Sequence, residues 1–129
     1  MTLESSLQVA LLLAAPRELP DLRLFRRNIG AVRFMGGQPT SSKRAVQFGI
    51  AGQSDLYALV RGGMHIEIEL KAASAPKRPP PDQEAWANWC KSWGVPHIVL
   101  RGEKEETVEQ TVKRWCNELR NLLEQSRHG

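Results

Sequence analysis

Two carboxylates and one ammonium group stand on two consecutive predicted strands of this 129-residue sequence. Asp55 opens the first strand, Glu69 and Lys71 close the second, and an Arg-Gly-Gly turn at 61–63 separates them. An antiparallel hairpin with such a tight turn places the start of its first strand beside the end of its second. Residues two apart on a strand share a face. The spacing therefore predicts that the three groups converge on one face of a sheet.

Such a group of side chains is suited to metal-assisted hydrolysis. Two carboxylates a few ångströms apart repel each other unless a cation lies between them. Carboxylates whose ion keeps water in its remaining positions suit Mg²⁺ or Mn²⁺. Such an ion polarises a phosphate oxygen and lowers the pKa of a bound water, and a nearby lysine can stabilise the developing charge. The alternative interpretation is a group of solvated surface ion pairs, which contribute little to stability.

Hydrophobic periodicity and the positions of Pro and Gly predict the surrounding elements. They are a helix over 2–14, a strand over 22–28, a mostly irregular segment over 29–54 with a short strand near 46–50, the hairpin strands 55–60 and 64–71, a helix over 82–93, a strand over 96–100 and a helix over about 103–126. Pro16 is expected to end the first helix, and Asp82 to cap the second. The order predicts a single domain of the α/β class, with helices packed on a small mixed sheet.

The candidate residues stand in an ordered series that resembles the PD-(D/E)XK nuclease core and, more narrowly, the virus-type replication-repair nuclease (VRR-NUC) domain. The matching segments are Glu4 with Gln8, Arg27-Asn28-Ile29-Gly30, Gly52-Gln53-Ser54-Asp55, Ile68-Glu69-Leu70-Lys71 and Gln83. The resemblance spans roughly residues 3–101. It departs from the family pattern at Ser54, because a proline commonly precedes the aspartate there.

The resemblance implies an αβββαβ core, which in this chain carries an extra C-terminal helix. It also implies Mg²⁺ or Mn²⁺ as cofactor and endonuclease activity on branched DNA, similar to that of Holliday junction resolvases. Stand-alone members of the family come largely from phages and bacteria, so a cytoplasmic protein is expected. Two alternatives stay open: a restriction-type or nicking endonuclease, and a non-catalytic nucleic-acid-binding module that kept the fold.

The resemblance also assigns roles to residues that the pattern alone leaves undecided. Glu4 is implied to be a ligand of the metal or of its water, although by position it is only an acid favoured near a helix N-terminus. Gln83 is implied to orient Lys71 or the attacking water, although it is otherwise an ordinary first-turn residue. The implied metal ligands are Asp55, Glu69, the backbone carbonyl of Leu70, and Glu4.

The positive charge of the chain is concentrated near its N-terminal third. The formal net charge is +4, and residues 17–44 carry seven basic residues against two acidic ones. A local basic excess is the electrostatic footprint of a nucleic-acid binder. The candidate DNA contacts are Arg26, Arg27, Asn28, Lys43 and Arg44. Side chains of these types bind phosphates well, but they are also compatible with a merely solvated segment.

Several other side chains have a structural and a functional interpretation. Glu67 shares the acidic face and is interpreted as solvent-facing rather than as a supporting residue of the site. The tryptophans at 86, 89 and 93 follow helical spacing, which favours a core or subunit-interface role over stacking on bases. Cys90 and Cys116 are expected to be reduced core thiols. The apolar run at 9–15 is too short to span a membrane.

We expect a C₂ homodimer. A four-way junction has near two-fold symmetry, and paired incisions on opposite strands require two matched sites, which a C₂ dimer supplies. Apolar stripes on the helix over 82–93 and on the C-terminal helix are both candidate interfaces, and the sequence does not choose between them.

Overall fold

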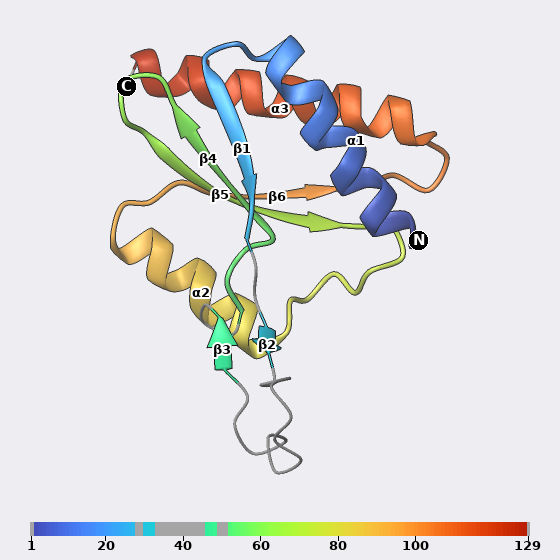
Figure 1. The fold of residues 1–129 in the computed structure, drawn as a ribbon, viewed down its shortest axis with the longest axis vertical. Helices are drawn as coiled ribbons and strands as arrows, with labels where there is room; N and C mark the ends of the chain where they lie inside the picture. Colours follow the sequence, from blue (N-terminus) through green and yellow to red (C-terminus); the bar gives the residue numbers. More distant parts are fainter. Residues whose placement is uncertain (1, 28–29, 33–45, 49–51, 129) are drawn as a thin grey trace, which may run out of the picture.

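The computed structural model of the chain describes residues 2–27, 30–32, 46–48 and 52–128. The elements in chain order are α1 (Leu3–Glu18), β1 (Leu22–Arg26), β2 (Gly30–Val32), β3 (Val46–Phe48), β4 (Leu56–Val60), β5 (His65–Lys71), α2 (Pro81–Ser92), β6 (His97–Arg101) and α3 (Val108–His128) (Figure 1). No helix in the described part of the chain is long and apolar enough to cross a membrane.

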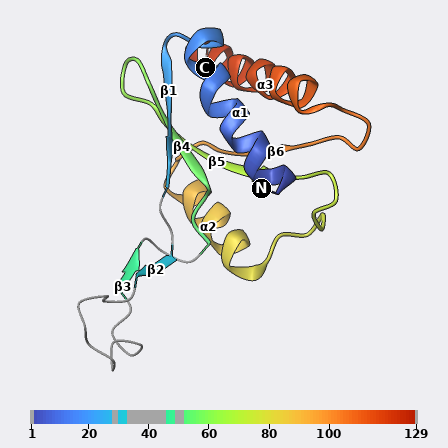
Figure 2. The ribbon, with the colours of Figure 1, turned by 45° about the vertical axis from the view of Figure 1, so that its right-hand side comes forward.

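The main sheet has the strand order β1-β4-β5-β6. β1 pairs antiparallel with β4 and β4 antiparallel with β5, whereas β5 pairs parallel with β6 across the α2 crossover. Together with α1, these elements form the predicted αβββαβ core, and α3 is the predicted extra helix. β2 and β3 pair only with each other and lie apart from the main sheet (Figure 2).

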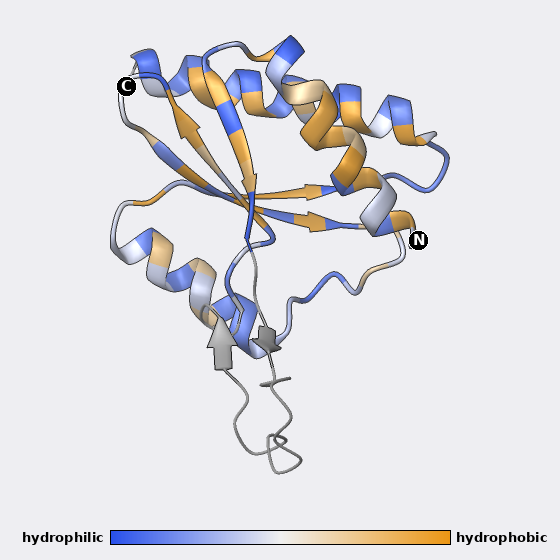
Figure 3. Ribbon diagram, in the orientation of Figure 1, coloured by the Kyte–Doolittle hydropathy of each residue, from blue (hydrophilic) through white to orange (hydrophobic). Residues whose placement is uncertain are grey.

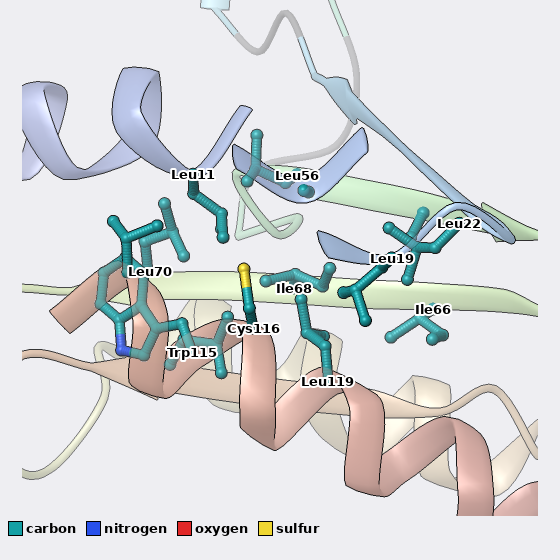
Figure 4. Packing of buried hydrophobic residues seen from close by; sticks show 14 of the residues in the cluster. Leu11, Leu19, Leu22, Leu56, Ile66, Ile68, Leu70, Trp115, Cys116 and Leu119 are labelled. Carbon is teal, nitrogen blue, oxygen red and sulfur yellow. The ribbon is translucent and has the colours of Figure 1, made fainter. Parts of the chain in front are cut away.

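The two faces of the sheet are covered by different helices. α1 and α3 lie on one side and α2 on the other (Figures 1 and 2). Strand residues that face α1 and α3 are buried and apolar, and Figure 3 shows hydrophobic stretches along these strands and α1. Leu11 of α1, Ile68 of β5 and Leu119 of α3 meet in this core (Figure 4). The opposite face is therefore the one left for polar chemistry.

Several predicted boundaries were wrong, each for a local reason. α1 continues through Pro16 to Glu18, because the Leu19 N–H donates to the Ala15 carbonyl at 2.8 Å and Leu19 is buried in the core. Packing of an apolar face thus outweighs the bond that Pro16 removes. α3 begins at Val108, several residues later than predicted, since Thr107 and Gln110 exchange side-chain-to-backbone hydrogen bonds in a capping box.

Two further differences concern short or capped elements. β2 lies in the segment predicted to be mostly irregular, because a strand of three residues is too short to show a period. α2 begins at Pro81 rather than after a cap at Asp82. A proline fits the first turn of a helix, where its missing N–H has no partner to lose. The Asp82 side chain instead accepts from the Gln83 N–H at 2.9 Å.

Gly52, which lies shortly before β4, packs directly against the start of α2. Its φ is +88°, and a Cβ added there would lie 2.2 Å from the Asp82 carbonyl oxygen. Only glycine combines this backbone conformation with so close an approach. The loop before Asp55 can therefore rest directly against the first turn of α2.

We predict that Gly52→Ala lowers the free energy of unfolding by about 2–5 kcal/mol, because left-handed backbone costs about 1–2 kcal/mol and overpacking about 1–3 kcal/mol more. Gly94 is the matched control, since its φ is +73° with open space around it. Gly94→Ala should lose only the backbone component. Urea unfolding measures both variants, and equal losses would show that the contact with Asp82 is unimportant.

Candidate active site

Asp55 and Glu69 lie side by side at one end of the β4–β5 ladder. Leu56 is the register partner of Ile68, and one further step along the ladder sets Asp55 opposite Glu69. Asp55 Oδ2 accepts a hydrogen bond from the Leu70 N–H at 3.0 Å. Burial, followed by the hydrogen bond and the charge of Asp55, raises the pKa of Glu69 to about 9. Negative charge on both carboxylates at once is therefore unfavourable.

Lys71 and Gln83 complete this group. The Lys71 Nζ donates to Gln83 Oε1 at 2.6 Å and lies 3.9 Å from Glu69 Oε1. Gln83 belongs to the first turn of α2, so the helix that follows β5 folds back over the lysine. The structure thus brings together four of the residues proposed from the sequence: Asp55, Glu69, Lys71 and Gln83.

The other two proposed ligands are placed less closely. Glu4 is exposed in the first turn of α1, and its charge contributes to the raised pKa of Glu69. Within the described residues, no hydrogen bond or salt bridge joins Glu4 to either site carboxylate. The Leu70 N–H points toward Asp55, and the N–H and C=O of a strand residue point to the same edge. The Leu70 carbonyl therefore faces the Asp55 side of β5.

These donors fit a hard divalent cation that keeps most of its water. Mg²⁺ is commonly held by one or two carboxylates rather than by a cage of protein ligands. Among the described residues, no group of three or more His, Cys, Asp and Glu side chains is arranged to hold a metal. The adjacent pair of Asp55 and Glu69, with a neighbouring carbonyl, matches the sparser arrangement. A divalent cation there would offset the repulsion between the two carboxylates.

A second polar cluster lies on the same face of the sheet, and sequence reasoning missed it. Glu67 is buried, with 2% of its side chain exposed, so its interpretation as solvent-facing was wrong. Its carboxylate forms a bidentate pair with Arg27 and bonds to His65 Nε2 and to the Trp86 indole N–H. Burial raises the pKa of Glu67, but the hydrogen bonds from Arg27 and His65 outweigh it and hold the pKa below its usual value.

The structure describes two of the five candidate DNA contacts, Arg26 and Arg27. The Arg27 side chain is only 15% exposed, and both terminal nitrogens bind Glu67, so its position fits an internal role better than a phosphate contact. Arg26 is exposed at the end of β1. Asn28, Lys43 and Arg44 lie outside the described residues. The sequence placed Glu67 on the same strand face as Glu69, but it gave no sign that Arg27, forty residues earlier, would be its partner.

The element order and strand pairing define a mixed α/β fold of αβββαβ order with an added C-terminal helix, in which Asp55 directly precedes β4 and Glu69 lies on β5. No family model and no curated protein matches the sequence. Among solved structures, the chain is similar to Hjc, a Holliday junction resolvase from the archaeal hyperthermophile Archaeoglobus fulgidus. The identity is 16%, the match covers 80% of this chain and 71% of that chain, and the TM-score is 0.46. At this identity, the likeness concerns the arrangement of elements.

We predict that Arg27→Ala lowers the free energy of unfolding by about 3–5 kcal/mol, because it leaves the buried Glu67 carboxylate without its cationic partner. The neighbouring exposed Arg26 supplies the control. Arg26→Ala should change stability by less than about 0.5 kcal/mol. Urea unfolding at neutral pH compares the two, and equal stabilities would contradict the internal role of Arg27.

Proposed function

We propose that this protein is a divalent-metal-dependent DNA endonuclease. One observation carries the proposal: the adjacent carboxylates of Asp55 and Glu69 share a sheet face with Lys71, whose ammonium is held by Gln83. Asp55, Glu69 and the Leu70 carbonyl would hold Mg²⁺ or Mn²⁺, with Glu4 as a further ligand of the metal or its water. The bound ion would supply a Lewis acid for a phosphate oxygen and a water of lowered pKa.

Lys71 is placed to act on the charge that develops during phosphodiester hydrolysis. An ammonium has three donors, and the hydrogen bond to Gln83 uses one of them while fixing the position of Nζ. Only 15% of the side chain is exposed, so water screens its charge weakly. A fixed, weakly screened cation stabilises a transition state without rearranging.

Space for the substrate lies next to these groups. A hollow of about 90 Å³ has Glu69, Lys71 and Gln83 in its lining, together with the cations Lys77 and Arg101. A cavity of this size lined by three cationic side chains suits a phosphate group rather than a base. A preference for branched DNA, as in Holliday junction resolvases, is supported by the sequence resemblance, whereas the basic excess over residues 17–44 supports nucleic-acid binding in general.

Asp55→Ala, Glu69→Ala and Lys71→Ala are each expected to reduce cleavage by at least about 100-fold while leaving DNA binding largely intact, because phosphate contacts supply the affinity. Glu84→Ala, an exposed acid in the same turn as Gln83, is the control and should cleave normally. Four-way junctions, flaps and linear duplexes, each with Mg²⁺ or Mn²⁺, form the substrate panel. Near-normal cleavage by any of the three site variants would refute the assignment.

The same panel separates the alternatives. A nicking or restriction-type enzyme would cut linear duplex as readily as the junction. A non-catalytic binding module would cut nothing, and calorimetry with Mn²⁺ would show no binding that depends on Asp55.

We also propose that the protein acts as a homodimer through the exposed surface of α2. The apolar stripe of α3 is buried inside the chain, where Trp115, Cys116 and Leu119 join the core. Trp89 on α2 is instead 41% exposed and Trp93 at the C-terminal cap of α2 is 70% exposed, and the two indoles stack with centroids 4.9 Å apart. Exposed aromatic residues of this kind are enriched at interfaces between subunits.

Light scattering should therefore give about twice the chain mass of 14.5 kDa. Trp93→Glu is expected to shift the protein to the monomer, because a charge would be buried in the interface without a partner. Leu13→Glu is the matched control, since Leu13 is 68% exposed but lies on α1. A wild-type mass near 14.5 kDa that persists with junction DNA bound would rule out the dimer.

A further inference from the structure

We propose that Arg27 and Glu67 form a positioning pair that sets the spacing of the candidate active site. Within the described residues, no hydrogen bond or ion pair joins the side chains of the pair to the side chains proposed to act on phosphate. The pair joins the three pieces of chain that carry them: the start of β4 with Asp55, the end of β5 with Glu69, and the first turns of α2 with Gln83. The catalytic consequence rests on the proposed function, whereas the geometric consequence can be measured without it.

The first link holds Asp55 against the edge strand. The Arg27 backbone N–H donates to the Asp55 carbonyl at 2.9 Å, one step beyond the last register pair of β1 and β4. The Arg27 side chain reinforces this contact, since its Nη1 donates to the Ser54 carbonyl at 3.3 Å. The same residue therefore holds the carbonyl oxygens of the two peptide bonds that flank the Asp55 Cα.

The second link crosses the sheet. Arg27 follows β1 and Glu67 lies on β5, so the bidentate pair spans the intervening strand β4. The guanidinium lies over the ring of Tyr57 on that strand, with Cζ 4.9 Å from the ring centroid. Glu67 precedes Glu69 by two residues and shares its face. Any shift of β5 relative to the start of β4 would have to break this pair.

The third link reaches α2. The Trp86 indole N–H donates to Glu67 Oε1 at 3.2 Å. Trp86 is one helical turn beyond Gln83 and on the same side of the helix, and Gln83 accepts from Lys71. The Glu67 carboxylate therefore also helps to fix the position of Gln83 on α2.

The energetics of buried ion pairs support a geometric role. Such a pair is seldom more stable than well-packed apolar residues of similar volume, because desolvation offsets the attraction. Here both carboxylate oxygens are occupied: Oε1 by Arg27 and Trp86, and Oε2 by Arg27 and His65. A fully bonded carboxylate has one orientation. An apolar replacement would fill the same space, but it would not fix the relative positions of the strands and of α2.

The decisive variant replaces both partners, Arg27→Met with Glu67→Met. If the pair positions the site, this double variant should fold yet lose site geometry. The amide of Leu70, which donates to Asp55, should exchange with deuterium about tenfold faster or more, relative to the core amide of Leu119. Mn²⁺ affinity measured by calorimetry should weaken roughly ten- to hundredfold. On junction DNA, kcat should fall with little change in KM.

The control is the ion pair of Arg61 and Asp21, whose Nε–Oδ1 distance is 3.0 Å and which lies at the opposite end of the β4–β5 hairpin from Asp55 and Glu69. Arg61→Met with Asp21→Met should leave the Leu70 amide and Mn²⁺ affinity unchanged. Should the Arg27 and Glu67 double variant fail to fold, Glu67→Gln decides by the same readouts. It keeps the volume of the side chain while weakening the bidentate bond, so Leu70 exchange and Mn²⁺ affinity should change in the same direction.

The outcomes separate the two proposals. A folded variant with wild-type Leu70 exchange and wild-type Mn²⁺ affinity would overturn the positioning role and leave the proposed function standing. Wild-type protein that neither binds Mn²⁺ nor cleaves DNA would overturn the proposed function, and Leu70 exchange alone would then decide whether the pair sets the geometry.

Discussion

The constraint on which this structure depends is the placement of two carboxylates side by side, with Glu69 buried and Asp55 half-buried. Burial and mutual repulsion raise the pKa of Glu69 to about 9, so the arrangement is unfavourable for both acids in the charged form. A fold keeps such a pair together only if the surrounding backbone holds it firmly. The Leu70 N–H on Asp55 and the Lys71 ammonium near Glu69 partly relieve the repulsion. A divalent cation would relieve it further.

The two faces of the sheet differ, one being apolar and the other polar, and this difference follows from the constraint. One face is packed by α1 and α3 into a continuous apolar core, which stabilises the sheet without contributing to the site. The opposite face can then hold charged groups, because α2 covers them only in part and supplies Gln83 and Trp86 as partners. Gly52 lets the loop before Asp55 pack against the first turn of α2, which carries Gln83.

The polar face holds two acidic centres that differ in their partners. Glu69 faces another carboxylate and its pKa is raised, whereas Glu67 faces a guanidinium and its pKa is lowered. They are two residues apart on one strand, so local sequence cannot account for the difference. The proposed roles follow from it: the strained pair suits a cation, and the satisfied carboxylate suits a fixed framework.

The sequence by itself determined the chemistry of the hairpin. Alternation along residues 64–71 and the Arg-Gly-Gly turn predicted that Asp55, Glu69 and Lys71 converge, because strand period and hairpin register are local properties. The αβββαβ order that the family resemblance implied was also confirmed. Helix ends were less accurate, since the continuation of α1 through Pro16 depends on burial of Leu19 in a core made by distant elements.

Only the tertiary structure decided the rest. Arg27 stands forty residues before Glu67, and no pattern in the sequence connects them, so the buried carboxylate of Glu67 was interpreted as solvent-facing. The sequence also showed two apolar stripes, but only packing determined that the one on α3 is buried, while Trp89 on α2 and Trp93 at its C-terminal cap remain exposed. Periodicity states that a helix has an apolar face, whereas the three-dimensional arrangement of all elements decides what that face meets.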